Sequence, residues 1–340
     1  MHKISRISLA FSGALLSAAL LGACSDDNAT TPFINTAATS SSSEQVIAPD
    51  QSSSSEATTT SSETAPVTQS SSSETLLPQS SSSATSIPDP SCVETPVATI
   101  AFDSLGLADL ADVFKSVRCN EKAVFVIRHG ERSDGDHTKY SPLTYWENET
   151  ADSIAGQPTD GVRQSIAVGK KLISDDEFTY THTKYLRTEQ TCFYINQGRG
   201  QATFPHDSTE IYSISWFKKD SERYDFYKDS TTNVRLVISG WAYDNLYADA
   251  FYDLKEKSEE IIKTHIAPDY ASMNKFRVIC SHDDFILPLS VFASNGTVNY
   301  RFHDPASRHW PYFLTGVAVI IDDKNQIRYV PFRGLGIGAE

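Results

Sequence analysis

Residues 123–132, AVFVIRHGER, carry the clearest fold signal in the sequence. Its first five residues are all apolar, which is typical of a central strand that is buried on both faces of a sheet. Arg128 and His129 follow this strand at once, so we expect them at the carboxyl edge of the sheet, where open α/β sheets bind ligands. A second strand pattern, Phe-Arg-Val-Ile-Cys at residues 276–280, is followed one residue later by His282. The sequence therefore predicts two polar strand ends at the same edge.

Helical and strand patterns alternate along residues 92–340, which are enough to bury a large core as one domain. The alternation predicts an α/β fold, a three-layer α/β/α sandwich with a mostly parallel central sheet. The aromatic-rich stretch 216–252 predicts either a small cap over the strand ends or part of the core. Besides the two strands above, the expected elements are helices over 161–173, 188–197 and 244–266, a short strand over 210–215, and a hairpin of strands 316–321 and 327–330.

The first 23 residues have the pattern of a signal peptide. Lys3 and Arg6 precede an apolar segment, residues 7–21, that is too short to read as a membrane-spanning helix. It ends in Leu-Gly-Ala-Cys, which resembles the lipobox of bacterial lipoproteins, where the cysteine (here Cys24) becomes the lipidated first residue. We therefore expect an extracytoplasmic protein with a lipid anchor in a bacterial membrane, and the lack of aspartate at position 25 favours the outer membrane. The alternative is an ordinary secretory peptide that is cut near Ala23.

Residues 24–91 are of low complexity, and we expect them to form a disordered tether. Four runs of four serines occur here, with Thr, Pro, Ala and Glu between the runs, and such a composition cannot offset the entropy cost of folding. The whole chain has a formal net charge of −14. Since nucleic-acid-binding proteins normally carry a basic patch, this charge argues against a nucleic-acid partner.

Four further cysteines lie in the expected domain, and an extracytoplasmic location would permit disulfides between them. Cys92 and Cys119 flank the start of the domain, so a bond between them could fasten its N-terminal segment. Cys192 and Cys280 fall in an expected helix and an expected buried strand. We expect these two to be small core residues, with pairing left open. No CxxC pair is present, so the cysteines predict no structural zinc site.

Two histidines, an aspartate and several arginines at one sheet edge suit phosphoryl transfer. A phosphoryl group in flight carries charge on three oxygens, and guanidinium groups match those oxygens and stay charged at any working pH. A neutral imidazole can attack in line and form a phosphohistidine. A carboxylic acid can protonate the leaving alkoxide, and its anion can then activate water. Because arginines supply the positive charge, we expect neither a metal ion nor another cofactor.

Four motifs resemble those of the histidine phosphatase superfamily, which includes phosphoglycerate-mutase-like enzymes, histidine acid phosphatases and phytases. The resemblance runs from about Val124 to Asp283, in the family order, and implies an α/β phosphatase domain that works through a phosphohistidine. The motifs are RHGER at 128–132, GVRQ at 161–164 with Gly169 and Leu172 after it, YLRTEQT at 185–191, and SHD at 281–283.

The resemblance implies a role for each matching residue. His129 would be the nucleophile, and His282 would stabilise the transferred phosphoryl group. Asp283 would be the proton donor, as in the acid-phosphatase branch. In the mutase-like branch the donor is a glutamate after the second arginine motif, and Glu222 or Asp220 could fill that position here. The residues implied to clamp the phosphoryl oxygens are Arg128, Arg132 and Arg187.

Two features depart from the family pattern. The acid-phosphatase branch usually has proline two residues after the second signature arginine, where this chain has Asp134, and this weakens a phytase assignment. For the family's Leu-Thr element, the pair Leu143-Thr144 competes with Thr159. The substrate would be chosen by the aromatic stretch 216–252 and by an insertion over 133–157, and neither has a readable code.

The leading hypothesis is a metal-independent phosphomonoester hydrolase that acts through a phosphohistidine on a small extracytoplasmic substrate. One alternative is a non-catalytic surface lipoprotein of the same fold that binds phosphorylated or sugar ligands. A second alternative is a metal-dependent hydrolase whose ligands would be His282, Asp283, His303 and Asp304. An acid beside arginines tends to have a lowered pKa, so the leading hypothesis predicts an enzyme that favours acidic conditions.

Overall fold

The computed structural model describes residues 99–340, except for residues 134–137, 146–159, 211, 337 and 339–340. The expected signal peptide, the expected tether and the expected lipidation site Cys24 lie outside the described residues and stay predictions. Within the described part, no helix is both long enough and apolar enough to cross a membrane.

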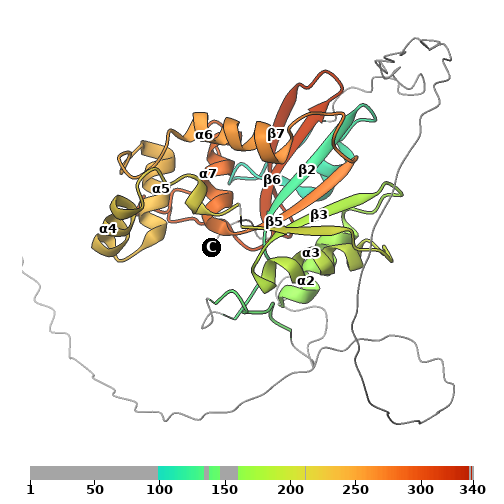
Figure 1. Cartoon of the computed structure of the whole chain (residues 1–340), viewed down its shortest axis with the longest axis horizontal. Coiled ribbons are helices and arrows are strands. Elements are labelled where there is room, and N and C mark those ends of the chain that lie inside the picture. Colours follow the sequence, from blue (N-terminus) through green and yellow to red (C-terminus); the bar gives the residue numbers. More distant parts are fainter. Residues whose placement is uncertain (1–98, 134–137, 146–159, 211, 337, 339–340) are drawn as a thin grey trace, which may run out of the picture. The chain divides into compact units, whose positions relative to one another are not determined.

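The described strands form one mixed sheet of seven strands in the order β1-β7-β6-β2-β5-β3-β4 (Figure 1). β5 is parallel to β2 and β3, and β4 is parallel to β3. β6 runs antiparallel to β2 and to β7, and β1 is parallel to β7. The expectation of a mostly parallel sheet is confirmed. The strands are β1 (Ala108–Asp109), β2 (Glu121–Arg128), β3 (Phe178–Thr183), β4 (His206–Thr209), β5 (Phe276–Ser281), β6 (Thr315–Asp322) and β7 (Ile327–Arg333).

Helices cover both faces of this sheet, so the three-layer arrangement is confirmed. Figure 1 shows α2 and α3 on one side of the sheet and α5 to α7 on the other. Two hydrophobic clusters fill the two spaces between the layers. The helices are α1 (Leu110–Lys115), α2 (Gly161–Lys170), α3 (Leu186–Gly198), α4 (Ser221–Thr231), α5 (Val234–Asp244), α6 (Leu254–Ile261) and α7 (Asp283–Ala293), with a 3-10 helix η1 (Ile214–Trp216) and a π-helix η2 (Ile262–Ile266).

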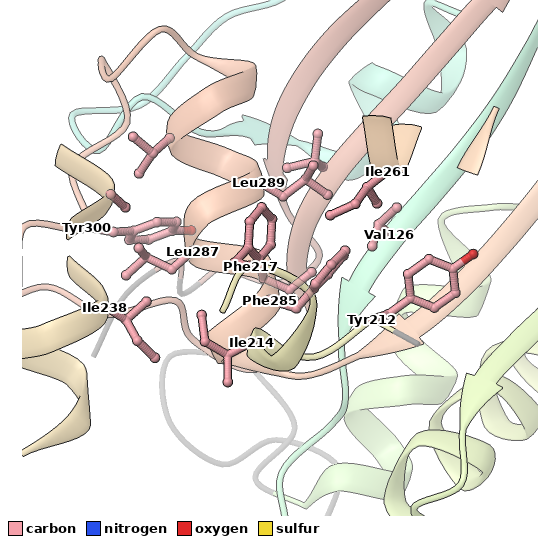
Figure 2. Close-up of a cluster of buried hydrophobic side chains, with 14 of the residues drawn as sticks. Val126, Tyr212, Ile214, Phe217, Ile238, Ile261, Phe285, Leu287, Leu289 and Tyr300 are labelled. Carbon is pink, nitrogen blue, oxygen red and sulfur yellow. The ribbon is translucent and has the colours of Figure 1, made fainter. Parts of the chain in front are cut away.

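The larger cluster joins the aromatic-rich stretch to the sheet. Phe285 and Leu289 of α7 lie near Phe217, and Val126 of β2 belongs to the same cluster (Figure 2). Trp241 of α5 stacks on Phe251 with a ring-centroid distance of 4.3 Å, and both side chains are buried. Most aromatic side chains of residues 216–252 therefore belong to this core or pack against it.

Two expected elements differ from the structure. The strand expected over 210–215 is wrong, because η1 occupies residues 214–216 and the strand β4 comes earlier. The long helix expected over 244–266 is wrong in its first half. There the chain turns at Asn245, which has a φ of 55°, and a new helix begins only after Asp253, whose side chain accepts a hydrogen bond from the backbone of Glu256. Apolar spacing alone did not reveal these two caps.

A disulfide joins Cys192 of α3 to Cys280 of β5, with 6.1 Å between the two Cα atoms. Both side chains are buried in the core, as expected. The pairing that the sequence left open exists because the helix crosses the sheet directly over the strand and brings the two side chains together. Cys119 is also disulfide-bonded. Its expected partner, Cys92, lies outside the described residues.

Candidate active site

Three parallel strands bring the candidate site together at their carboxyl ends. β2 ends at Arg128, β5 at Ser281 and β3 at Thr183, and the three strands are neighbours in the sheet. The backbone N–H of His129 donates to the carbonyl of Ser281 (2.9 Å), which extends the β2–β5 ladder into the site. His282 follows as the N-cap of α7. The expectation that both polar strand ends meet at one sheet edge is confirmed.

His129 is buried, with 3% of its surface exposed. Its Nδ1 lies 2.7 Å from the carbonyl oxygen of Gly130. Because a carbonyl only accepts, Nδ1 carries the hydrogen and Nε2 presents a lone pair. The guanidinium of Arg187 donates to that Nε2 from its Nε at 3.2 Å. The nitrogen that can attack a substrate therefore faces a fixed positive charge.

Arg128 lies between an aromatic ring and a carboxylate. Its Nη2 is 3.1 Å from the Oδ2 oxygen of Asp283, and its guanidinium lies 4.1 Å from the ring centre of Phe313. Its Nη1 donates to the carbonyl of Pro311. The same carboxylate oxygen accepts a hydrogen bond from the indole N–H of Trp310 (2.8 Å). The carboxyl group of Asp283 is thus held in one orientation while its side chain remains 26% exposed.

His282 lies against His129, with 5.5 Å between the ring centroids. Its Nε2 is 3.0 Å from the hydroxyl oxygen of Thr183. The ring of Tyr185 contacts it edge to face, at a centroid distance of 4.7 Å. The second histidine is therefore fixed by groups from the end of β3 and the segment before α3.

The other two arginines flank the histidine pair. Arg187 is in the first turn of α3 and is buried, and its Nη1 donates to the carbonyl of Thr138 (2.9 Å). Arg132 is half-buried and donates to the carbonyl of Ser133 (2.9 Å). The positive charge of Arg132 lowers the pKa of His282, so it acts on the same site. The three arginines expected from the sequence are brought together around the two histidines.

Both histidines are kept neutral. Burial, followed by the charges of His282, Arg128 and Arg187, holds the pKa of His129 well below its usual value. Burial and the charge of Arg187 lower the pKa of His282 to about 3, against the opposing effect of Asp283. Burial and positive neighbours thus favour the neutral form of both rings, the form in which an imidazole can act as a nucleophile.

The pKa values of the adjacent carboxyl groups of Asp283 and Asp284 are shifted in opposite directions. Burial alone would raise the pKa of Asp283, but the charge of Arg128 and the hydrogen bond from Trp310 lower it below its usual value. Burial and the neighbouring charge of Asp283 raise the pKa of Asp284 to about 7. Within the described part of the chain, one Asp284 oxygen, Oδ1, is buried without a hydrogen-bond partner. At neutral pH the pair therefore carries its negative charge mostly on Asp283.

We expect Asp284→Asn to stabilise the protein above pH 7. A raised pKa in the folded state means that the protonated form stabilises the fold at low pH, and this contribution is lost as the pH rises through 7. Asparagine keeps the shape without the charge, so the free energy of unfolding at pH 8 should rise by about 2 kcal/mol relative to the wild type. Urea denaturation at pH 5 and pH 8 measures it.

The control for this variant is Asp229→Asn, whose side chain is 77% exposed. It should change the free energy of unfolding by less than about 0.5 kcal/mol at either pH. An Asp284→Asn protein that is equally destabilised at both pH values would show that the carboxyl group is ionised in the fold, against the expectation.

The loop that carries the RHGER motif, here called the signature loop (residues 128–132), packs closely against α2 and α3 at Gly130. The backbone N–H of Gly130 donates to the hydroxyl of Thr191 (2.9 Å). A Cβ atom at this position would lie 2.8 Å from both Gly161 O and Ser165 Oγ. Any larger residue would push α2 away from the loop that carries His129, which is the physical reason for glycine here.

Leu143 and Thr144, one of the two candidates for the family's Leu-Thr element, contact the signature loop. The backbone of Thr144 donates to the carbonyl of Glu131 (3.0 Å), and its hydroxyl accepts from the backbone N–H of Gly161 (2.8 Å). Leu143 pairs with Arg132 in a β-bridge. The Leu143-Thr144 pair therefore ties the signature to the start of α2, while Thr159 lies outside the described residues.

Four further candidate residues have their described contacts elsewhere. Asp220 is the exposed N-cap of α4, where its side chain accepts from the backbone of Glu222 and Arg223, and Glu222 is exposed in the first turn of that helix. His303 binds Asp244 through Nε2 (2.6 Å) and contacts the Ser239 hydroxyl through Nδ1 (2.8 Å). Asp304 caps a turn by accepting from the backbone of Ala306. Among the described residues, His303 and Asp304 therefore do not join His282 and Asp283 in the metal site of the second alternative. The choice of proton donor between Asp283 and the alternatives Glu222 and Asp220 stays a prediction.

Sequence reasoning missed the residues that orient the expected ones. Trp310, Pro311 and Phe313 hold Arg128 and Asp283, and Thr183 contacts His282. The aromatic run that includes Trp310 and Phe313, just before the expected hairpin, was a usable signal. β3, in which Thr alternates with Phe, Tyr and His, was overlooked because it has no continuous apolar run.

The chain is similar to several solved structures, although no family model and no curated protein sequence matches it. A phosphoglycerate mutase from Bacillus anthracis is 14% identical, covers 63% of this chain and 93% of its own, and has a TM-score of 0.40. A putative α-ribazole-5′-phosphate phosphatase from Escherichia coli is 15% identical over 64% and 98%, with a TM-score of 0.34. A putative phosphohistidine phosphatase from Nakamurella multipartitia is 13% identical over 62% and 93%, with a TM-score of 0.31. These proteins are members of the histidine phosphatase superfamily, the family that the four sequence motifs resemble.

Proposed function

We propose that this protein is a phosphomonoester hydrolase that acts through a phosphohistidine on His129. The observation that carries the proposal is the lone pair of His129 Nε2, which faces Arg187 while the Arg128–Asp283 ion pair lies in the same buried cluster. A neutral nucleophile, positive charge for the phosphoryl oxygens and a carboxyl group for the leaving oxygen are the parts that this chemistry needs.

In the first step, His129 Nε2 attacks phosphorus, and the bond from phosphorus to the ester oxygen breaks. The hydrogen on Nδ1 stays on the imidazole, and its bond to the Gly130 carbonyl stabilises the positive charge that the ring acquires. The side chains of Arg128, Arg132 and Arg187 would neutralise the phosphoryl oxygens. The carboxyl group of Asp283 would give its proton to the leaving alkoxide.

Substrate binding itself would prepare Asp283 as an acid. Arg128 lowers the pKa of this carboxyl group through their ion pair. A bound phosphate dianion would compete with Asp283 for the ion pair with Arg128. It would also add negative charge beside the carboxylate. Both effects raise the pKa of Asp283, so the proton is held most strongly when a leaving group is present.

In the second step, the Asp283 carboxylate would take a proton from a water molecule that attacks the phosphohistidine. The bond between phosphorus and Nε2 breaks, inorganic phosphate leaves, and both His129 and Asp283 return to their starting protonation states. His282 would hold the phosphoryl group in both steps, since its ring is fixed against His129 by Thr183 and Tyr185.

We expect the purified full chain to release phosphate from an alkyl phosphomonoester such as glycerol 2-phosphate, with EDTA present. kcat/KM should be at least about tenfold higher at pH 5 than at pH 9, because the protonated fraction of Asp283 grows as the pH falls. The lowered pKa values of His129 and His282 keep both rings neutral at pH 5, so no loss near pH 6.5 is expected. Colorimetric phosphate release between pH 4 and 9 measures the profile.

Two outcomes would contradict the proposal. A folded protein that releases no phosphate from several phosphomonoesters, but binds them, would favour the non-catalytic binding protein. Activity that disappears in EDTA and returns with a divalent metal would favour a metal-dependent hydrolase.

We also propose that the protein is extracytoplasmic and held to a bacterial membrane by lipid on Cys24, as the lipobox-like end of the apolar segment suggests. Because a lipid chain supplies the membrane affinity, Cys24→Ser should move most of the protein from the membrane fraction to the soluble fraction. Immunoblots of fractionated cells measure this, with Ser25→Ala as the control that stays with the membrane. Equal membrane retention of the Cys24→Ser protein would argue against the anchor.

A further inference from the structure

A second cluster of ligand-type side chains lies outside the histidine pair described above. His182 comes from β3, His206 from the edge strand β4 and Glu189 from α3. One nitrogen or oxygen atom from each of the three lies within 4.8 Å of the other two. The three residues are separated by 7 and 17 positions in sequence (189 − 182 and 206 − 189), so no local spacing motif announces them.

The pleat of the sheet places both histidines on the face that α3 covers. His206 is opposite Tyr180 in the parallel β3–β4 register, and His182 is two residues after Tyr180. Since alternate residues of a strand share a face, the two imidazoles point to the same side as Tyr180, which packs with Ile195 of α3. Their rings are roughly parallel, with 5.6 Å between the centroids.

His182 is the residue that points to a ligand. It is 5% exposed, and its Nδ1 lies 2.8 Å from the carbonyl oxygen of Thr183, to which it donates. Its Nε2 therefore carries a lone pair, and this atom is buried without a hydrogen-bond partner among the described residues. A buried acceptor without a partner destabilises the fold, so a ligand that binds this nitrogen would remove that cost.

His206 has the same orientation at the surface. Its Nδ1 lies 2.8 Å from the carbonyl oxygen of Phe204, to which it donates, and its ring stacks on that phenylalanine at a centroid distance of 4.2 Å. Metal-binding histidines usually donate their other N–H to a carbonyl in this way, because the bond sets the tautomer and the ring direction. Both imidazoles therefore carry a lone pair on Nε2, and one nitrogen of each ring lies within 4.8 Å of a carboxylate oxygen of Glu189.

We propose that His182, His206 and Glu189 bind one divalent transition-metal ion of the zinc type, with water as the remaining ligand. Two imidazoles and one carboxylate are a ligand set that zinc prefers, whereas calcium and magnesium favour oxygen ligands. Ligand atoms around tetrahedral zinc are about 3.4 Å apart. His206 and Glu189 are exposed, so their side chains can close the remaining gap without moving the buried His182.

The ion would tie together elements that also position the histidine pair. His182 precedes Thr183, which contacts His282, and Glu189 is two residues after Arg187. A bound ion would therefore hold β3, β4 and the first turns of α3 against one another. It would stabilise the fold without touching the phosphoryl group, and the proposal does not depend on the hydrolytic activity.

The test is zinc binding by the full chain after EDTA treatment and dialysis into phosphate-free buffer. Calorimetric titration with ZnCl₂ should give one site, and the melting temperature should rise by about 5 °C at a hundredfold excess of zinc over its Kd. His206→Ala and Glu189→Gln change exposed side chains, so both variants should fold. Each should bind zinc at least about tenfold more weakly and lose most of the thermal shift.

His129→Ala is the matched control, because the histidine pair is the other place where zinc could bind. This variant should keep the affinity and the thermal shift of the wild type. Phosphate release by His206→Ala and Glu189→Gln in metal-free buffer should stay at the wild-type level. The proposal is overturned if the wild type binds no zinc, if His206→Ala binds it unchanged, or if His129→Ala abolishes the binding.

Discussion

His129→Ala should lower kcat/KM for phosphomonoesters by at least about a thousandfold, which is the scale expected when a covalent nucleophile is removed. Water would have to attack in its place, without the orientation that the Gly130 carbonyl and Arg187 give to the imidazole. The variant should also form no phosphoenzyme. The wild type, mixed with labelled substrate and quenched in alkali, should retain label in a form that acid removes, as phosphohistidine does.

The loss of activity in His129→Ala supports the assignment only if this variant is folded. His129 is a buried neutral ring between positive charges, so its removal should leave the melting temperature within a few degrees of that of the wild type. His265→Ala is the control, since His265 lies in η2 and packs against Trp216 rather than against the histidine pair. Activity that survives in His129→Ala, with label still bound to the protein, would place the nucleophile elsewhere.

Asp283→Asn should show the second largest effect, and the effect should depend on the leaving group. For an alkyl phosphomonoester, whose alkoxide needs a proton, kcat/KM should fall by about 100- to 1,000-fold. For p-nitrophenyl phosphate, whose leaving group is stable as an anion, kcat/KM should change by less than about tenfold. Because kcat/KM reports the steps up to formation of the phosphohistidine, the comparison isolates proton donation to the leaving oxygen.

The second step provides an independent readout for the same variant. The amide group that replaces the Asp283 carboxylate cannot take a proton from water, so the phosphohistidine should accumulate, and a burst of nitrophenol close to one per enzyme should precede slow turnover. Glu222→Gln is the matched control, because Glu222 is the alternative donor from the mutase-like branch and is exposed on α4. If Glu222→Gln showed the leaving-group dependence and Asp283→Asn did not, the assignment of the donor would be reversed.

The sheet edge was predictable from sequence because its physics is local. A run of five apolar residues next to Arg128 and His129 is typical of a buried strand end, and β5 has a similar pattern with one arginine among four apolar residues. The hairpin of β6 and β7 was predictable for a similar reason, since two apolar strands flank a polar turn. The ends of the longer helices were predicted less accurately, because each end is set by one capping residue, as at Asn245 and Asp253.

The partners of the site residues were not predictable in the same way. Trp310 reaches Asp283 across 27 positions of sequence, and Thr183 reaches His282 across 99. The same holds for the disulfide between Cys192 and Cys280, which are 88 positions apart. No propensity or periodicity encodes such a distance, so these pairings follow only from the way in which the layers pack.

By itself, then, the sequence determined the chemical inventory: an apolar strand that ends in Arg128 and His129, a second that ends before His282 and Asp283, and helices between them. Tertiary structure alone decided how that inventory behaves. Burial and the charges of Arg128 and Arg187 lower the pKa values of both histidines, and Arg132 also lowers that of His282. The ion pair with Arg128 lowers the pKa of Asp283, whereas burial and the charge of Asp283 raise the pKa of Asp284. The reason is physical: hydrophobic pattern is a property of neighbours along the chain, whereas desolvation and charge depend on neighbours in space.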